Sequence, residues 1–122
     1  MKLYYAPGAC SLAVHIALRE IGATFDRVAV DLARHVTADG ADCLDIDARG
    51  CVPLLQLDDG SRHPEAASLL KYVADVDPTQ APIGPAGSAR RPISSPNLQA
   101  HVERVAQRPR VQAALVAEGR VP

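Results

Sequence analysis

The chain of 122 residues has very few aromatic side chains: three tyrosines, one phenylalanine and no tryptophan. Hydrophobic residues nevertheless make up 48% of the sequence, so the core must rely on close packing of alanine, valine, leucine and isoleucine. The length suffices for one domain with a modest core. Without aromatic stacking platforms, and with a net charge of −1 from interspersed acids and bases, the sequence offers no surface for nucleic acid or anionic lipid.

Long apolar runs are missing as well. No segment approaches the length that crosses a bilayer, and the first residues lack the apolar stretch of a secretory signal. The three cysteines, Cys10, Cys43 and Cys51, form no C-x-x-C pair, which is typical of a reducing compartment and not of a disulfide scaffold. The four histidines show no metal-ligand spacing. We therefore expect a cytoplasmic protein with no membrane segment and no metal site.

The most informative segment is YYAPGACSL, residues 4–12, which runs from a short apolar strand through a Pro-Gly turn to a cysteine at the start of a helix. Unpaired backbone N–H groups and the positive end of the helix dipole meet at that position and favour a thiolate, the reactive form of cysteine. Cys10 is therefore a candidate nucleophile or thiol-binding residue. The alternative is a small buried hydrophobic residue, and the local context leaves both interpretations open.

Hydrophobic patterning predicts an α/β unit. A strand at residues 2–5, a helix at 10–21 and a strand at 25–31 suggest a parallel crossover. A short irregular helix is expected within 37–46, with Leu44 and Ile46 facing inward. The remaining predicted elements are a strand at 52–57, a turn at 58–60, a returning strand at 61–63 and a helix at 65–75.

Two further predictions concern that last helix: Pro64 lies just ahead of its start, and Ala67, Leu70, Val73 and Ala74 lie near one face of it.

A change of composition follows, because five prolines with glycines and serines fall between residues 78 and 96. This composition is typical of a linker. Beyond it, Leu98, Val102 and Val105 recur at helical spacing, and a second short helix is expected at 111–118 with Pro109 in its first turn. Such short helices cannot fold alone and must dock on another element. The predicted organisation is a domain at 1–77, a linker at 78–96 and a helical tail at 97–122.

Three stretches resemble the bacterial beta class of glutathione S-transferases. They are MKLYYAPGACSLAVHIALRE, the segment Gly50-Cys51-Val52-Pro53-Leu54, and Pro64-Glu65-Ala66 leading into LLKYVAD. The resemblance implies a thioredoxin-like βαβαββα domain, followed here by the Pro-rich linker and a short C-terminal helical tail. In the family an all-helical second domain follows the linker. Here the linker leads directly to NLQAHVERVAQRPRVQAALVAEG, which resembles the last helices of that domain, so the chain looks internally truncated.

The resemblance also implies glutathione as cosubstrate and gives each matching residue a role. Cys10 lies against the glutathione sulfur and can form a mixed disulfide with it. Val52 presents its main-chain groups to the cysteinyl unit, as an added strand would, and Pro53 is cis. Glu65 pairs with the ligand's ammonium, and the N–H groups at Glu65 and Ala66 receive the γ-glutamyl carboxylate at a helix N-terminus. Taken without the resemblance, Glu65 is simply an acid favoured by the helix dipole.

Several positions depart from the family pattern. His35 stands where a lysine is common, which replaces a fixed charge by a titratable one. Cys51 occupies a position that usually holds glutamine or an aromatic residue. Ala66 keeps the backbone N–H but has no side-chain hydroxyl, and Asp47-Ala48-Arg49 replaces Asn-Pro-Lys. His35 and Cys51 remain part of the predicted glutathione site, with modestly weakened recognition.

Two functions follow from these observations. The first is a glutathione-dependent enzyme that uses Cys10 for thiol transfer or conjugation. The alternative is a catalytically impaired remnant that acts as a binding or interaction module. A glutaredoxin-type reductase is disfavoured because no C-x-x-C is present. Family dimers pack the first domain of one subunit against the helical domain of the other, so the missing segment removes part of the expected homodimer interface.

Overall fold

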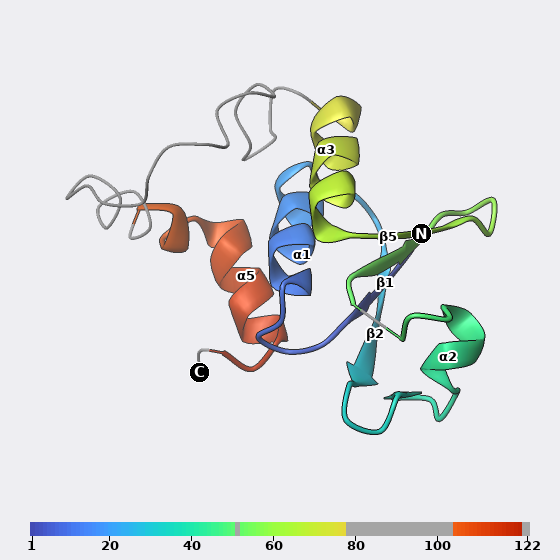
Figure 1. The fold of residues 1–122 in the computed structure, drawn as a ribbon. Helices are drawn as coiled ribbons and strands as arrows, with labels where there is room; N and C mark the ends of the chain where they lie inside the picture. Colours follow the sequence, from blue (N-terminus) through green and yellow to red (C-terminus); the bar gives the residue numbers. More distant parts are fainter. Residues whose placement is uncertain (51, 78–103, 121–122) are drawn as a thin grey trace, which may run out of the picture.

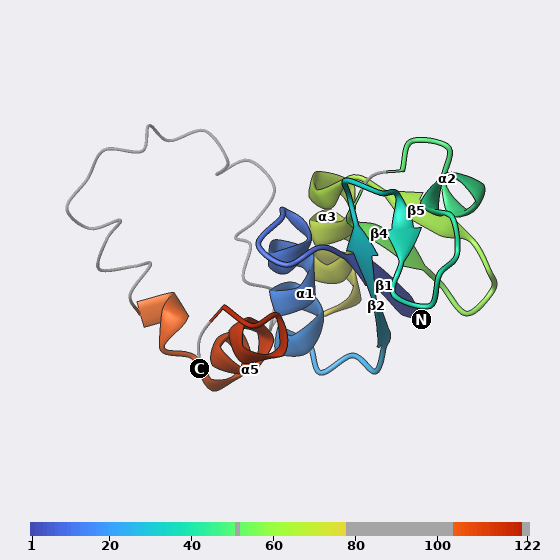
Figure 2. The ribbon, with the colours of Figure 1, turned by 90° about the horizontal axis from the view of Figure 1, so that it is seen from below.

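The computed structural model describes residues 1–50, 52–77 and 104–120. These residues form a five-stranded sheet with helices packed against it (Figures 1 and 2). The strands are β1 (Lys2–Tyr5), β2 (Asp26–Asp31), β3 (Val36–Thr37), β4 (Leu54–Gln56) and β5 (Arg62–Pro64). The helices are α1 (Ser11–Glu20), α2 (Cys43–Ile46), α3 (Ala66–Val76) and α5 (Pro109–Ala117).

The central strand of the sheet is β1, and the strand order is β3-β2-β1-β4-β5. β1 runs parallel to β2, and α1 connects the two, which confirms the predicted crossover. On its other side β1 pairs antiparallel with β4, and β4 pairs antiparallel with β5 across the predicted turn. Leu3 of β1 is therefore flanked by Arg27 and Leu55. The parallel arm and the antiparallel hairpin together match the thioredoxin-like fold.

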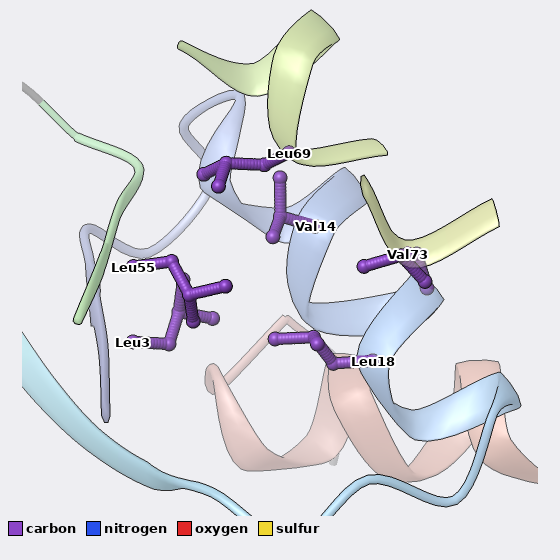
Figure 3. Packing of buried hydrophobic residues seen from close by; sticks show 7 residues of the cluster. Leu3, Val14, Leu18, Leu55, Leu69 and Val73 are labelled. Atoms are coloured by element: carbon purple, nitrogen blue, oxygen red, sulfur yellow. The ribbon is translucent and has the colours of Figure 1, made fainter. Parts of the chain in front are cut away.

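Alternation along the strands separates two apolar clusters on opposite faces of the sheet. The larger cluster lies between the sheet and helices α1 and α3, and Figure 3 shows its side chains pointing toward one another. Its members are Leu3, Val14, Ala17, Leu18, Leu55, Leu69 and Val73. The smaller cluster lies on the α2 side of the sheet and consists of Tyr4, Val30, Cys43 and Leu54.

Helix α5 packs beside α1, far from it in sequence (Figure 2). Val111 and Ala114 are 3% and 0% exposed at this contact. Pro109 occupies the first turn of the helix, as predicted. The expectation that the tail docks on another element is thus met for the part of it that the structure describes.

The predicted helix within residues 37–46 is mostly wrong. Only Cys43–Ile46 is helical, and the preceding residues form β3 and a turn. The Thr37 hydroxyl donates to the Ala41 carbonyl and accepts from the Ala41 N–H, which closes this turn, while the Asp42 side chain caps the short helix. Leu44, expected to face inward, is 48% exposed.

Smaller differences concern the next elements. The strand predicted at 52–57 is limited to Leu54–Gln56. Pro64 is the last residue of β5 and lies just ahead of Glu65, the N-cap residue of α3, which agrees with its predicted place before the helix. On α3 the buried positions are Leu69 and Val73, whereas Ala67 is exposed. Leu69 and Val73 are four residues apart, so they share the face of α3 that packs on the larger apolar cluster, whereas Ala67, two residues before Leu69, lies on another side of the helix.

The predicted linker at 78–96 lies outside the described residues, as do Leu98 and Val102. Within the described ranges, no helix has the length and apolar character needed to cross a membrane. The same part of the chain contains no cluster of three or more His, Cys, Asp or Glu side chains that could hold a metal ion.

Candidate functional site

Three separate parts of the chain meet at one open pocket with a volume of about 150 Å³. They are the start of α1, the loop before β4, and the junction of β5 and α3. The pocket is lined by Cys10, Arg49, Val52, Pro53, Pro64, Glu65, Ala66 and Ala67. Five of the seven residues predicted for the site are in this set: Cys10, Val52, Pro53, Glu65 and Ala66.

Cys10 is the N-cap residue of α1, and its side chain is exposed at the pocket. The loop before it is held in place by Ser11, whose buried hydroxyl accepts from the Ala6 N–H and donates to the Ala6 carbonyl. The Cys10 thiol donates to the carbonyl oxygen of Val52, with an Sγ–O distance of 3.4 Å. An accessible sulfur at a helix N-terminus is a setting suited to nucleophilic thiol chemistry.

The second component is the main chain at Val52 and Pro53. The peptide bond between these residues is cis, as the resemblance implied. Pro53 is buried, whereas Val52 is only partly buried and lines the pocket beside the Cys10 thiol. The Val52 backbone thus lies next to the sulfur, where an extended peptide ligand could pair with it.

The third component is the N-terminus of α3. Glu65 precedes the helix with a φ of 75°, a left-handed conformation that is unusual for a residue other than glycine. Its side chain makes no capping hydrogen bond to the helix. Ala66 and Ala67, the first residues of α3, line the pocket, so the backbone N–H groups of the first helical turn are available to an anionic group there.

Arg49 is a pocket residue that the sequence interpretation missed. Its guanidinium Nη1 lies 3.2 Å from Glu65 Oε1, and the two side chains are 57% and 68% exposed. Such an exposed ion pair contributes about 0–1 kcal/mol to stability. The sequence did contain a hint of this role: Arg49 is a cation only three residues before Val52, whose backbone was already predicted to bind the ligand.

Two predicted residues are not placed in the pocket. Cys51 lies outside the described residues. His35 is exposed and does not line the pocket; it has a φ of 54°, and its ring lies against Gly50. A Cβ on Gly50 would approach His35 Nδ1 to 2.8 Å, so the loop before Val52 packs tightly here. The roles proposed for His35 and Cys51 remain predictions.

Cys43 differs from Cys10 in its surroundings. It is 6% exposed and belongs to the smaller apolar cluster. Burial raises the pKa of the Cys43 thiol, and the neighbouring carboxylates of Asp42 and Asp39 raise it further. Of the two described cysteines, Cys10 is therefore the one placed for reaction, and Cys43 packs the core.

Comparison with known proteins identifies curated relatives that match about three quarters of this chain. Glutathione S-transferase GstA of Escherichia coli O157:H7 is 44% identical over 91 residues, which cover 75% of this chain and 45% of that protein. Glutathione S-transferase GST-4.5 of Xanthomonas campestris pv. campestris is 43% identical over 90 residues, covering 74% and 42%. The chain thus spans less than half the length of these relatives. No protein-family model matches it.

Solved structures extend the similarity along the chain. A bacterial beta-class glutathione S-transferase from Sphingomonas chungbukensis aligns with a TM-score of 0.84 at 31% identity, covering 99% of this chain and 100% of that one. A sphingomonad glutathione S-transferase complexed with glutathione aligns with a TM-score of 0.82 at 29% identity and the same coverage. Sequence and fold therefore agree, and the chain belongs to the glutathione S-transferase family, within its bacterial beta class.

Proposed function

We propose that this chain binds glutathione in the pocket at Cys10 and uses the Cys10 sulfur for thiol exchange. The observation that carries the proposal is the meeting of Cys10, Val52 and Glu65 at one pocket, although they are far apart in sequence. A structural neighbour in the same family was solved in complex with glutathione, which supports the choice of ligand. Val52 would pair with the cysteinyl unit, and Glu65 with the ligand's ammonium.

The reaction is a pair of thiol–disulfide exchanges. The Cys10 thiolate attacks the glutathionyl sulfur of a mixed disulfide between glutathione and a second thiol. The old S–S bond breaks, the second thiol leaves as a thiolate, and Cys10 becomes bound to glutathione. A further glutathione thiolate then attacks the glutathione sulfur of that intermediate, which releases oxidised glutathione and restores the Cys10 thiolate.

Replacing Cys10 by serine tests this mechanism. We expect Cys10→Ser to abolish glutathione-dependent reduction of a small mixed disulfide, because a hydroxyl cannot form the mixed-disulfide intermediate. The measurement is the rate of oxidised-glutathione formation in a coupled assay. Cys43→Ala is the matched control, since Cys43 is buried in the core away from the pocket, and it should keep the activity. Unchanged turnover in Cys10→Ser would disprove the mechanism.

The alternative proposal is a binding or interaction module without turnover. It is favoured by one observation: the chain spans less than half the length of its curated relatives, so the similarity by itself does not carry over the activity of those whole proteins. Calorimetric titration with glutathione distinguishes the cases. Binding without turnover supports the module, binding with Cys10-dependent turnover supports the enzyme, and no heat at millimolar glutathione contradicts a glutathione site altogether.

A further inference from the structure

The pocket contains one pair of opposite charges. Among the described residues that line it, Arg49 is the one cation and Glu65 the one carboxylate, and the two form an ion pair with an Nη1–Oε1 distance of 3.2 Å. Both side chains are more than half exposed, so the pair is well solvated and contributes little to folding stability. Each partner can therefore exchange the other for a ligand group at low cost.

The positions of the two charges are set by backbone that is itself well held. Arg49 lies in a tight turn in which the Gly50 N–H donates to the Asp47 carbonyl at 2.8 Å. Gly50 is buried against the His35 ring, which fixes the turn next to Val52. Glu65 precedes α3 in its left-handed conformation. The guanidinium thus projects from the loop before β4 toward the start of α3.

Apart from the Cys10 thiol, the other side chains that line the pocket have no hydrogen-bond donor for an anion. Pro53, Pro64, Ala66 and Ala67 carry no polar side-chain atoms, so a carboxylate entering here can be received by backbone N–H groups and by Arg49. An arginine guanidinium matches a carboxylate with two parallel hydrogen bonds, which gives both strength and orientation. This chemistry suits a ligand that presents a carboxylate close to an ammonium group.

We propose that Arg49 is a specificity-determining residue that binds the α-carboxylate of the ligand's γ-glutamyl end, while Glu65 binds the α-ammonium of the same end. The carboxylate and the ammonium of this end are adjacent, as in every α-amino acid. On binding, the Arg49–Glu65 ion pair is therefore replaced by two ion pairs, one from Arg49 to the carboxylate and one from Glu65 to the ammonium. This inference rests on the proposed glutathione site and adds to it the residue that selects the γ-glutamyl group.

Titration calorimetry of Arg49→Gln tests the assignment. We expect the variant to bind glutathione about tenfold more weakly than wild type, because a charge-assisted hydrogen bond to the carboxylate is lost. γ-Glutamylcysteine, which keeps the γ-glutamyl end, should lose the same factor, whereas cysteinylglycine, which lacks it, should bind both proteins equally. Arg34→Gln removes the same charge from an exposed loop position outside the pocket and is the matched control.

The outcomes separate this inference from the proposed function. Wild-type binding of glutathione with unchanged or tighter binding by Arg49→Gln would overturn the role of Arg49 and leave the glutathione site standing. An equal loss with cysteinylglycine would also overturn it, since the effect would then not depend on the γ-glutamyl group. Absence of glutathione binding by the wild type would overturn the proposed function and this inference together.

Discussion

His15 is a fully buried imidazole whose hydrogen bonds define its protonation state. The Arg19 Nε–H donates to His15 Nε2 at 2.9 Å, so that nitrogen is an acceptor. The proton is therefore on Nδ1, which lies 2.8 Å from Glu118 Oε1 and donates to it. Burial is the main factor that lowers the pKa of His15; Glu118 opposes the shift, and Arg19 and Arg27 add to it. The folded protein thus holds a neutral histidine at this position.

A pH dependence of stability follows from this residue. Its pKa is lower in the folded state than the ordinary value of about 6.5, so the unfolded chain takes up the proton more readily. The contribution to the free energy of unfolding is present above about pH 6.5 and decreases as the pH falls below it. Urea unfolding at a series of pH values from 8 down to about 5 measures the effect, starting above the ordinary histidine pKa.

His15→Gln is the variant that tests the cause. An amide can accept from Arg19 and donate to Glu118 but takes up no proton, so we expect a flatter pH profile and a loss of only about 1 kcal/mol at neutral pH. His63→Gln, at an exposed position on β5, should keep the wild-type profile. An equally steep loss of stability on acidification in His15→Gln would show that another group controls it.

At the scale of elements, the principal feature is the docking of α5 on α1. α5 has nine residues, too few to be stable alone, so packing must hold it. Polar contacts surround the buried face: Arg110 donates to the Glu20 carbonyl, and Arg27 donates to the Ala117 carbonyl. Directly after the helix, the Glu118 carboxylate binds His15 and also accepts, at 3.4 Å, from the N–H of Gly8 in the loop before Cys10. The tail therefore contacts the segment that carries the candidate nucleophile.

Removing the Glu118 carboxylate should loosen this docking. We expect Glu118→Ala to lower the free energy of unfolding by about 1.5–3 kcal/mol, because the buried His15 N–H loses its charged acceptor. Val116→Ala is the control on the same helix; its side chain is half exposed, so the cost should stay within about 0.5 kcal/mol. Chemical denaturation provides the comparison, and equal stabilities of the two variants would show that the Glu118 contact does not hold the tail.

At the scale of the whole molecule, stability depends on an aliphatic core between the sheet and helices α1 and α3. Leu18 is 0% exposed and packs against this cluster (Figure 3). Truncation to alanine leaves a cavity that a close-packed interior cannot fill by relaxation. We therefore expect Leu18→Ala to lower the free energy of unfolding by about 2–5 kcal/mol.

Leu44→Ala is the matched control for this prediction, because the same side chain is removed from a position that is 48% exposed. It should cost much less, since little buried contact is lost. Thermal or denaturant unfolding of the two variants side by side is sufficient. Similar losses in both would mean that Leu18 is not part of a close-packed core.

Local sequence patterns were enough to predict the segment that carries Cys10 and most of the helices and strands. The strand before Pro7-Gly8, the helix that starts after Cys10, the parallel crossover and the hairpin around Gly60 depend on short-range periodicity and turn residues, and the structure shows all of them. The irregular segment before α2 was predicted poorly. Side-chain hydrogen bonds of Thr37 and Asp42 decide its conformation, and no periodic signal reports such bonds.

The sequence by itself determined where a reactive cysteine stands, which strands surround it and which family the chain resembles. Only the tertiary structure decided which distant charges meet. Arg49 and Glu65 are 16 residues apart, and His15 and Glu118 are 103 apart, yet each pair is in contact. Such pairings depend on how the elements pack against one another, because two side chains distant in sequence come into contact only when the whole fold brings their backbones together.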